Sequence, residues 1–416
     1  MESLVPLVSS HSPVYGLLIF ALALTLSSIK PEYKALVFIS SLAIIVNIYS
    51  LNLEKIFIER TEIIKIVSAV FGLEVLSALL SKGRFYELIS HRILGRARSP
   101  NRIFIMMNLL TALLSAILSN VLVLLYMVLV AVKLAECIPE FDPRDLVTSL
   151  IISSNLGSMA TFMGDISNII VGVNGDISFL DFLSVAAPIS MASTLLSLSV
   201  LFILLRRGGR FHCEVAERSE IRGENPYLIF GLTSLILMLT LIPFSRRLGI
   251  DDSLAIGITA VFLLFLGGDE ISKVFTEVDW PSLIYLGALL LTTESINLIG
   301  GFKILFEEMS LFRNQLNVYF VSIGLSMLID DAEAVAILSP VLRSLNAGRD
   351  LWWAAIVGSS IGSALTPWGS IANIIALRKL RESYRGISIL RFLKISILAN
   401  LPTIILAYVM LNWVSE

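Results

Sequence analysis

The chain has 416 residues, of which 56% are hydrophobic and only 15% are charged, and its formal net charge is −2. Soluble domains carry about 25% charged residues, so this composition excludes an ordinary soluble protein and predicts a membrane protein. The nearly neutral balance gives no indication of a nucleic-acid partner, and the partner that we expect from composition is membrane lipid.

Apolar segments long enough to cross a bilayer follow one another through the first half of the chain. They lie at 14–29, 35–51 and 62–80, as an interrupted pair around 102–133, as a broken span at 145–173, and at 179–205. The first segment has no positive n-region and no cleavage-like site, so we expect a retained span rather than a signal peptide. Cys137 and Cys213 both fall in polar connections, and they predict neither a disulfide framework nor a thiolate metal site.

The second half of the chain repeats this order. Its segments lie at 227–244, 252–266 and 280–299, as an interrupted pair around 314–346, as a broken span at 350–377, and at 387–412. The stretch GSMATFMGDISNII (157–170) matches GSALTPWGSIANII (362–375) with an offset of 205 residues, which indicates a duplication. We therefore predict a first repeat at 1–205, a charged cytoplasmic linker at 206–226, and a second repeat at 227–416.

The number of spans predicts how the two repeats are oriented. If each interrupted pair is a re-entrant hairpin, each repeat crosses the membrane five times, and an odd number inverts the second repeat relative to the first. With the N-terminus outside, the cytoplasmic connections hold 22 Lys and Arg and the outer connections hold 8. This excess of positive charge favours that orientation for a multi-pass protein of the plasma membrane.

The two broken spans contain clusters of small and polar residues that make poor continuous helices. Unpaired backbone groups are tolerated inside a membrane only where they face protein or a water-filled cavity. The half-helix ends, together with hydroxyl and amide groups, can then bind a small cation or an oxygen-rich solute. The alternative is that the small residues only allow close helix packing, but two matched copies beside polar hairpin tips favour a binding site.

The two hairpin tips differ in charge. The first tip is Ser119-Asn120, and the aligned residues of the second are Asp330-Asp331, with Glu333 close by. A charged side chain at mid-membrane costs about 2.5 kcal/mol or more, so these acids must either hold protons or be neutralised by a cation. The alternative is a shallow hairpin whose acids lie in water, and it applies most to Glu333. Glu74 and Glu294 are further acids in apolar segments whose role stays open.

Several stretches resemble the ion transporter superfamily, which includes arsenite permeases, D-type sodium/proton antiporters, the P-protein group and citrate transporter-like carriers. The resemblance is carried by residues 80–120, GSMATFMGDISNIIVG (157–172), residues 279–301, LIDDAEAVAILSP (328–340) and GSALTPWGSIANIIAL (362–377). It implies an all-α fold with a scaffold domain of outer spans and a transport domain holding both hairpins and both broken helices. It also implies elevator-type movement, often in a homodimer.

This chain departs from the superfamily's patterns at three places. The dicarboxylate carriers have Ser-Asn-Thr at both tips, whereas the threonine is missing twice here. The prolines of the superfamily's Gly-Asp-Pro-Pro-Asn stretch are replaced by Ile166 and Ser167, which leaves Asp165 and Asn168.

The predicted function is a proton- or cation-coupled secondary transporter, first of all an efflux permease for an oxyacid such as arsenite. A sodium/proton antiporter is the alternative, and a dicarboxylate or other anion carrier ranks last because no Lys or Arg lies near the tips or breaks in the sequence. An enzyme is not expected, because MGDIS lacks the first glycine of a Gly-x-Gly-Asp protease and His11, His91 and His212 form no metal pair. We expect no cofactor other than a bound Na⁺ or H⁺.

The candidate residues for the binding site come from both tips and both breaks. They are Ser119, Asn120, Asn155, Gly157, Ser158, Thr161, Asp165, Asn168, Asp330, Asp331, Glu333, Gly362, Ser363, Thr366 and Asn373. Asn120, Asp330 and Asp331 are the candidate ligands for Na⁺.

Overall fold

The computed structural model describes residues 12–89, 99–137, 142–205, 225–268, 271, 273–305 and 312–415, and within these residues every regular element is helical. The predicted linker falls almost entirely outside the described residues, as do Cys213, His11, His91 and His212. The first repeat contains α1 (Pro13–Ile29), α2 (Lys34–Tyr49), α3 (Leu53–Glu59), α4 (Thr61–Lys82), α6 (Pro100–Ser115), α7 (Asn120–Cys137), α8 (Pro143–Ser158), α9 (Ile166–Asn174), α10 (Phe179–Ser184) and α11 (Ala186–Leu205).

The second repeat has the same order of main helices. It contains α12 (Pro226–Ser245), α13 (Asp252–Leu266), α15 (Trp280–Leu298), α16 (Gly301–Leu305), α17 (Gln315–Leu328), α18 (Asp331–Ser344), α19 (Arg349–Leu365), α20 (Ile371–Ser383) and α21 (Ile389–Ser415). The predicted spans are therefore confirmed as helices, and both interrupted pairs and both broken spans are interrupted where the sequence predicts it.

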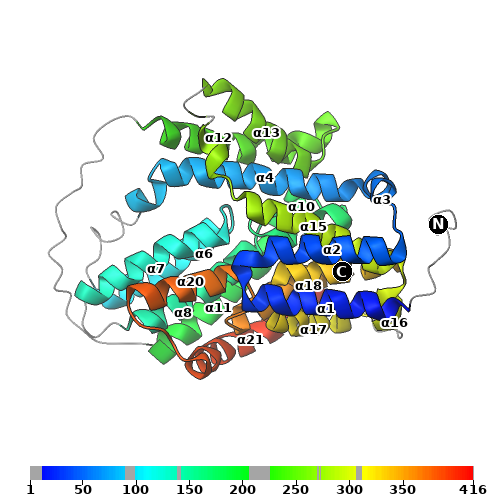
Figure 1. Ribbon diagram of the computed structural model, residues 1–416. Coiled ribbons are helices and arrows are strands. Elements are labelled where there is room, and N and C mark those ends of the chain that lie inside the picture. Colours follow the sequence, from blue (N-terminus) through cyan, green and yellow to red (C-terminus); the bar gives the residue numbers. More distant parts are fainter. Residues whose placement is uncertain are drawn as a thin grey trace.

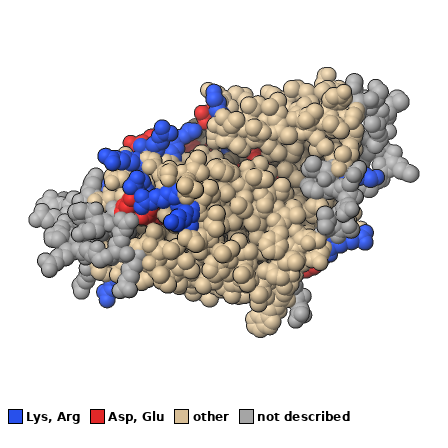
Figure 2. Space-filling model, turned by 90° about the horizontal axis from the view of Figure 1, so that it is seen from below, with Lys and Arg blue, Asp and Glu red and all other residues tan. Residues whose placement is uncertain are grey.

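Length and composition confirm a polytopic membrane protein. Five of the described helical segments are long and apolar enough to cross a membrane, namely Pro31–Tyr49, Thr61–Lys82, Phe179–Leu205, Pro226–Leu248 and Ile389–Trp413. Figure 2 shows charged side chains gathered mainly towards one end of the molecule, with a broad face between the ends that is almost free of charge. Such a face fits the hydrocarbon layer of a bilayer.

The helices form two groups, which we define by their packing (Figure 1). The scaffold helices are α1, α2, α4, α12, α13 and α15, which pack on one another through α4–α13, α2–α15, α12–α13 and α1–α2. The hairpin bundle is α6 to α9, α11 and α17 to α21, joined through α6–α8, α17–α19, α7–α20 and α9–α18. Each hairpin therefore packs against broken helices of both repeats, and this interlocking places the two tips close to the two breaks.

Ion pairs show that equivalent scaffold helices run in opposite directions. Arg60, which directly precedes α4, pairs with Glu294 near the end of α15 at 2.8 Å between Nε and Oε1. Lys82, the last residue of α4, pairs with Glu277, which precedes α15. Because α4 and α15 occupy the same place in the two repeats, their antiparallel arrangement is the inversion that the odd number of spans predicts.

The scaffold helices and the hairpin bundle are packed together at one end of the molecule and separated by a cavity at the other. In the half that holds Arg60 and Glu294, which we call the far end, α9 packs against α4 and α18 packs against α15. At the other end, which we call the cavity end, the corresponding faces of α7 and α20 line an open cavity. The structure is therefore open at the end that the positive-inside rule predicts to be cytoplasmic.

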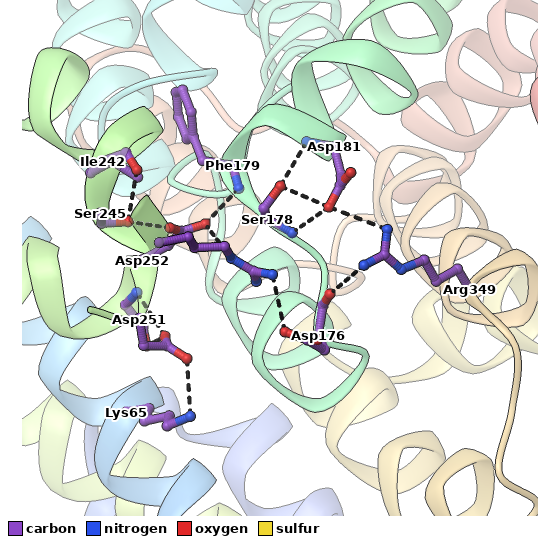
Figure 3. Close-up of polar contacts among 12 residues, drawn as sticks. Lys65, Asp176, Ser178, Phe179, Asp181, Ile242, Ser245, Asp251, Asp252 and Arg349 are labelled. Atoms are coloured by element: carbon purple, nitrogen blue, oxygen red, sulfur yellow. Dashed lines mark hydrogen bonds and ion pairs between the residues drawn. The ribbon is translucent and has the colours of Figure 1, made fainter. Parts of the chain in front are cut away.

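Polar contacts reinforce the closed far end, as Figure 3 shows. The Asp252 carboxylate at the start of α13 accepts a hydrogen bond from the Phe179 backbone N–H at 2.8 Å, which joins the scaffold to α10. Asp251 caps α13 and pairs with Lys65 of α4 at 2.9 Å. Burial raises the pKa of Asp251, but hydrogen bonds from Ser253 and Lys65 outweigh it and hold this pKa below its usual value.

Candidate functional site

The breaks in the two broken helices are built in the same way. Asn168 Nδ2 donates hydrogen bonds to the carbonyls of Ser158 and Thr161 at 2.8 and 2.7 Å. Asn373 Nδ2 donates to the carbonyls of Ser363 and Thr366 at 2.8 and 3.1 Å. The carbonyls of Thr161 and Thr366 also accept the N–H groups of Gly164 and Gly369, whereas the asparagines are the donors that the structure gives to the carbonyls of Ser158 and Ser363, which have lost their helical donors.

One glycine in each break lets the backbone pack closely against its neighbours. A side chain at Gly164 would collide with the Ser158 carbonyl, and one at Gly369 would lie 2.6 Å from the Ser326 carbonyl. The threonines then fasten each break to the neighbouring hairpin, because Thr161 Oγ1 donates to the Ala116 carbonyl and Thr366 Oγ1 donates to the Met327 carbonyl. This geometry explains why the same Gly and Thr positions recur in both repeats.

A polar contact joins the two breaks at the centre of the bundle. Asn155 Nδ2 donates to Asn373 Oδ1 at 2.9 Å, and Ser363 Oγ donates to Asn155 Oδ1 at 3.1 Å. All three side chains are buried. Asn155 therefore connects the repeats inside the protein.

The hairpin tips place Asn120 and Asp331 at equivalent positions, as the sequence alignment predicts. Asn120 is the first residue of α7, and Asp331 is the first residue of α18. Asn120 Nδ2 donates to Asp165 Oδ2 at 2.5 Å. Asp165 is itself the N-cap of α9, where its other oxygen accepts from the Ser167 backbone N–H. The first tip thus presents an amide that holds a carboxylate.

The second tip presents two neighbouring carboxyl groups. Asp330 caps α18, and its Oδ1 accepts a hydrogen bond from the Ile371 N–H at the start of α20 at 3.0 Å. The Asp331 backbone N–H donates to the Gly369 carbonyl at 3.0 Å, and its Oδ1 accepts from the Ala332 N–H at 2.9 Å. These contacts fix the acidic tip against the second break. Partial positive charge at the starts of α18 and α20 then lies beside the acids.

The tips meet in one cavity of about 490 Å³ at the cavity end. Among the described residues, its polar lining includes neutral polar side chains, acids from the tips, the first break and the scaffold side, and two cationic side chains. These residues are Ser119, Asn120, Ser370, Asp165, Asp330, Asp331, Glu74, Asp279, Glu32, Glu277, Lys34 and Arg378. Asp330 and Asp331 are 8% and 3% exposed, so the cavity reaches acids that lie deep in the protein rather than in bulk water.

The other predicted site residues lie behind this lining. Asn155, Gly157, Ser158, Thr161, Asn168, Gly362, Ser363, Thr366 and Asn373 are buried in the breaks and do not line the cavity. Glu333 is buried too, and its Oε1 accepts hydrogen bonds from Ser27 of α1 and Tyr285 of α15, each at 3.0 Å. The structure thus brings Ser119, Asn120, Asp165, Asp330 and Asp331 together at the cavity, with the remaining candidates around them.

Glu74 and Glu294, whose role the sequence left open, have different surroundings. Glu74 lies in the middle of α4 and lines the cavity. Glu294 lies at the far end, where Arg60 and Arg343 both pair with its buried carboxylate. Glu294 therefore belongs to the closure of the far end and not to the cavity.

Sequence reasoning missed Lys34 and Tyr285. Lys34 begins α2, and its Nζ lies 4.4 Å from the centre of the Tyr285 ring. Both residues line the cavity, so the expectation that no cationic side chain lies near the tips does not hold in three dimensions. The sequence offers only a weak signal, since Lys34 stands beside the short polar connection that begins at Lys30.

Comparison with known proteins supports the transporter fold of this chain. Residues 5–358 match the family model described as "Citrate transporter". The chain belongs to this family. The predicted membership of the ion transporter superfamily is thereby confirmed, and the chain is a transporter rather than an enzyme.

Several proteins are similar to the chain over most of their length. A "46 kDa membrane protein" of Mycobacterium leprae is 25% identical, and the match covers 95% of this chain and 97% of that protein. An uncharacterized transporter of Mycobacterium tuberculosis is 24% identical, with 96% and 97% covered. The inner membrane protein YbiR of Escherichia coli is 26% identical, with 75% and 78% covered.

A solved structure shows the same fold. The YdaH transporter of Alcanivorax borkumensis, whose structure is described as having an unusual topology, superposes with a TM-score of 0.57. The match covers 97% of this chain and 98% of that chain at 12% sequence identity. This likeness confirms the polytopic transporter fold.

Proposed function

We propose that this family member is a secondary active transporter whose coupling cation, H⁺ or Na⁺, binds between Asn120, Asp165, Asp330 and Asp331. The observation that carries the proposal is that three carboxyl groups, from both repeats, line one cavity beside the tips and breaks. Carboxylates gathered in a poorly hydrated site repel one another, and protonation or a bound cation relieves that repulsion. Occupancy of the site is therefore linked to the proton or cation concentration.

The residues present fit Na⁺ as well as H⁺. Hard cations prefer oxygen ligands, and Asn120, Asp330 and Asp331 offer amide and carboxylate oxygens beside the free ends of broken helices. The Asn120 amide holds the Asp165 carboxylate beside these donors at 2.5 Å, so a further oxygen ligand lies within reach of the same site.

The size of the cavity supports an additional, oxygen-rich cargo. Its volume of about 490 Å³ lies within the range of about 300–1,000 Å³ that is typical of small-molecule sites, and one bare ion needs far less. The family description names citrate, which as an anion needs hydrogen-bond donors or positive charge. Arsenite at neutral pH is mainly the neutral acid As(OH)₃, whose hydroxyl groups can donate hydrogen bonds to carboxylates. We propose a small oxyacid or carboxylate as cargo, moved by exchange with, or together with, the coupling cation.

Transport requires that the site open alternately to the two sides of the membrane. The hairpin bundle packs against the scaffold at the far end and leaves the cavity at the other end. An elevator-type displacement of the bundle along the scaffold would exchange these contacts, because the two repeats are inverted copies. From the resemblance alone we further propose a homodimer, which chemical cross-linking in membranes would test.

The deciding experiment measures cation-coupled flux in reconstituted vesicles with Asp331→Asn. We expect this variant to lose the dependence of transport on the proton or sodium gradient, because one of the three carboxyl groups no longer ionises. Glu87→Gln is the control, since Glu87 pairs with Arg84 in an exposed i,i+3 contact. Flux of arsenite, citrate and Na⁺ is measured in the same vesicles across pH. Full rate and unchanged pH dependence in Asp331→Asn would refute the proposal.

A sodium/proton antiporter is the second candidate, and the number of acids in the cavity favours it. In that mechanism Na⁺ and H⁺ compete for the same carboxyl groups and no other cargo is moved. A pH-sensitive dye that is quenched by a proton gradient across the vesicle membrane would recover its fluorescence if Na⁺ alone dissipates that gradient. A response to Na⁺ alone, with no flux of arsenite or citrate, would establish the antiporter instead of the solute carrier.

A further inference from the structure

Lys34 lines the same cavity as the acidic tip and comes from the other group of helices. It is the first residue of the scaffold helix α2, whereas Asp330 and Asp331 belong to the hairpin bundle. Its Nζ rests over the ring of Tyr285 at 4.4 Å from the ring centre, a distance at which a cation–π contact stabilises an ammonium group. Lys34 is half-buried, so water screens its charge less than it would at the surface.

The Tyr285 ring, which contacts the Lys34 ammonium group, is itself held in place by its surroundings. Tyr285 is 1% exposed, and its hydroxyl donates to Glu333 Oε1 at 3.0 Å. Glu333 also accepts a hydrogen bond from Ser27, while its other oxygen is buried and has no hydrogen bond from the part of the chain that the structure describes. Since Glu333 lies in α18, two residues after Asp331, one network links the acidic tip, the tyrosine and the lysine.

The charges that line the cavity are unbalanced. The carboxyl groups of Asp165, Asp330 and Asp331 lie at the tips and breaks, and Glu74 and Asp279 lie on the scaffold side. Of the two cationic side chains in the lining, Arg378 pairs with Glu32 at 3.4 Å near the mouth. Lys34 lines the same cavity as Asp330, Glu74 and Asp279, and its ring partner Tyr285 is hydrogen-bonded to Glu333. It is therefore the scaffold's own countercharge for the acids that the tip presents.

We propose that Lys34 is a tethered cation that competes with the coupling ion for the acidic tip. When the coupling ion leaves, the ammonium group replaces part of its charge, and when the ion returns, the two positive charges repel each other. The inference rests on the proposed function, because it assumes that a cation binds at Asp330 and Asp331. It goes beyond that function by assigning a role in coupling to a scaffold residue that lies outside both tips and both breaks.

This arrangement makes ion affinity depend on the position of the bundle. Lys34 moves with the scaffold and the acids move with the bundle, so displacement of one group along the other changes the distance between them. Where Lys34 is near, ion release is favoured, and where it is distant, ion binding is favoured. A charge on the scaffold thus makes the ion affinity differ between the two states of the transporter, and this difference shifts the equilibrium between them when the ion binds.

The test compares Na⁺ binding to purified wild type, Lys34→Gln and Lys34→Arg by titration calorimetry with NaCl at constant ionic strength. Removing one positive charge near the site is expected to lower the Na⁺ dissociation constant about tenfold or more, and Lys34→Arg should restore the wild-type value. Lys30→Gln is the matched control, because Lys30 lies four residues earlier, is exposed and does not line the cavity. Equal dissociation constants in wild type and Lys34→Gln would overturn the inference.

A second measurement distinguishes this role of Lys34 from cargo binding and from a general loss of folded, active protein. Lys34→Gln should keep the exchange of Na⁺ for Na⁺ across vesicles but slow net transport, in which the bundle must return without an ion. Loss of citrate or arsenite binding with unchanged Na⁺ affinity would instead make Lys34 a cargo ligand and refute the proposal. If wild type itself binds neither Na⁺ nor coupling protons, the proposed function fails. If wild type binds Na⁺ and Lys34→Gln has the same dissociation constant, only this inference fails.

Discussion

Glu294→Gln is predicted to open the far end of the protein. In the structure the Glu294 carboxylate accepts from Arg60 Nε at 2.8 Å and from Arg343, and its side chain is only 4% exposed. Arg343 lies at the end of α18 in the hairpin bundle, whereas Glu294 belongs to the scaffold helix α15. The pair therefore holds the two groups of helices together at the end where an outward-facing state has to part them.

The size of the effect follows from burial. Removing one partner of a fully buried ion pair costs about 3–5 kcal/mol because a charge is left uncompensated. Arg60 and Arg343 keep 27% and 21% of their side-chain surface, so water compensates part of the loss. We expect about 2–3 kcal/mol, and a closure weakened by that amount shifts the equilibrium between closed and open far ends by roughly 30- to 150-fold.

Cysteine labelling from outside measures this shift. Val121→Cys places a thiol in the cavity, in a background in which Cys137 and Cys213 are replaced by Ser, and a membrane-impermeant maleimide is added to intact cells. Labelling should be slow with Glu294 present and at least tenfold faster with Glu294→Gln. Glu87→Gln, which removes an exposed pair, should leave the rate unchanged. If Glu294→Gln changes neither the labelling rate nor the melting temperature, the ionic closure does not hold the far end.

Three further changes test other parts of the structure. Asn168→Ala removes the donor of the Ser158 carbonyl, while the Thr161 carbonyl keeps the Gly164 N–H, so it should lower stability by about 1–3 kcal/mol in thermal unfolding in detergent. A loss of transport with normal stability would make Asn168 an ion ligand instead. Because the pKa of Asp251 lies below its usual value, its charge stabilises the fold above about pH 4 and this contribution is lost as pH falls through the folded-state pKa. Lys65→Gln should therefore reduce the drop in melting temperature on acidification, and an identical drop would contradict this account. Arg378→Gln should leave the melting temperature unchanged, since the pair with Glu32 is about half exposed on both sides, and a clear decrease would show a stronger contact.

The segments and their interruptions could be predicted because their signals are local. A run of apolar residues sets the length of a span, and clusters such as Gly157 to Gly164 set its break. Counting the spans was enough to predict the inversion, which the ion pairs of Arg60 and Lys82 confirm. Such features need no knowledge of which helix lies beside which.

Roles within the candidate site could be predicted only in part. Residue type shows that Asn120, Asn155 and Asn168 are polar groups in an apolar setting, but not whether their amides face the cavity or the backbone. The structure shows that Asn168 completes the break while Asn120 faces Asp165. Only tertiary packing distinguishes these roles.

Helix geometry could have separated the acids of the second tip. Residues two apart on a helix point about 200° away from each other, so Asp331 and Glu333 must face different surroundings. The structure places Asp331 at the cavity and Glu333 against Ser27 and Tyr285. Lys34 could not have been found this way, because almost 300 residues separate it from the acids and only folding brings them to one cavity.

The repeats share a backbone frame but distribute their charges differently. Each half has a tip held to a break by a threonine, yet the first half carries its acid at the break, as Asp165, while the second carries its acids at the tip, as Asp330 and Asp331. An inverted pair of similar frames allows two similar arrangements that expose opposite ends, which alternating access needs. A fully symmetric set of charges would bind an ion equally in both. Acids on one group of helices and Lys34 on the other remove that equality, so the asymmetry of charge sets how readily the ion binds and leaves on each side, while the ion gradient sets the direction of net transport.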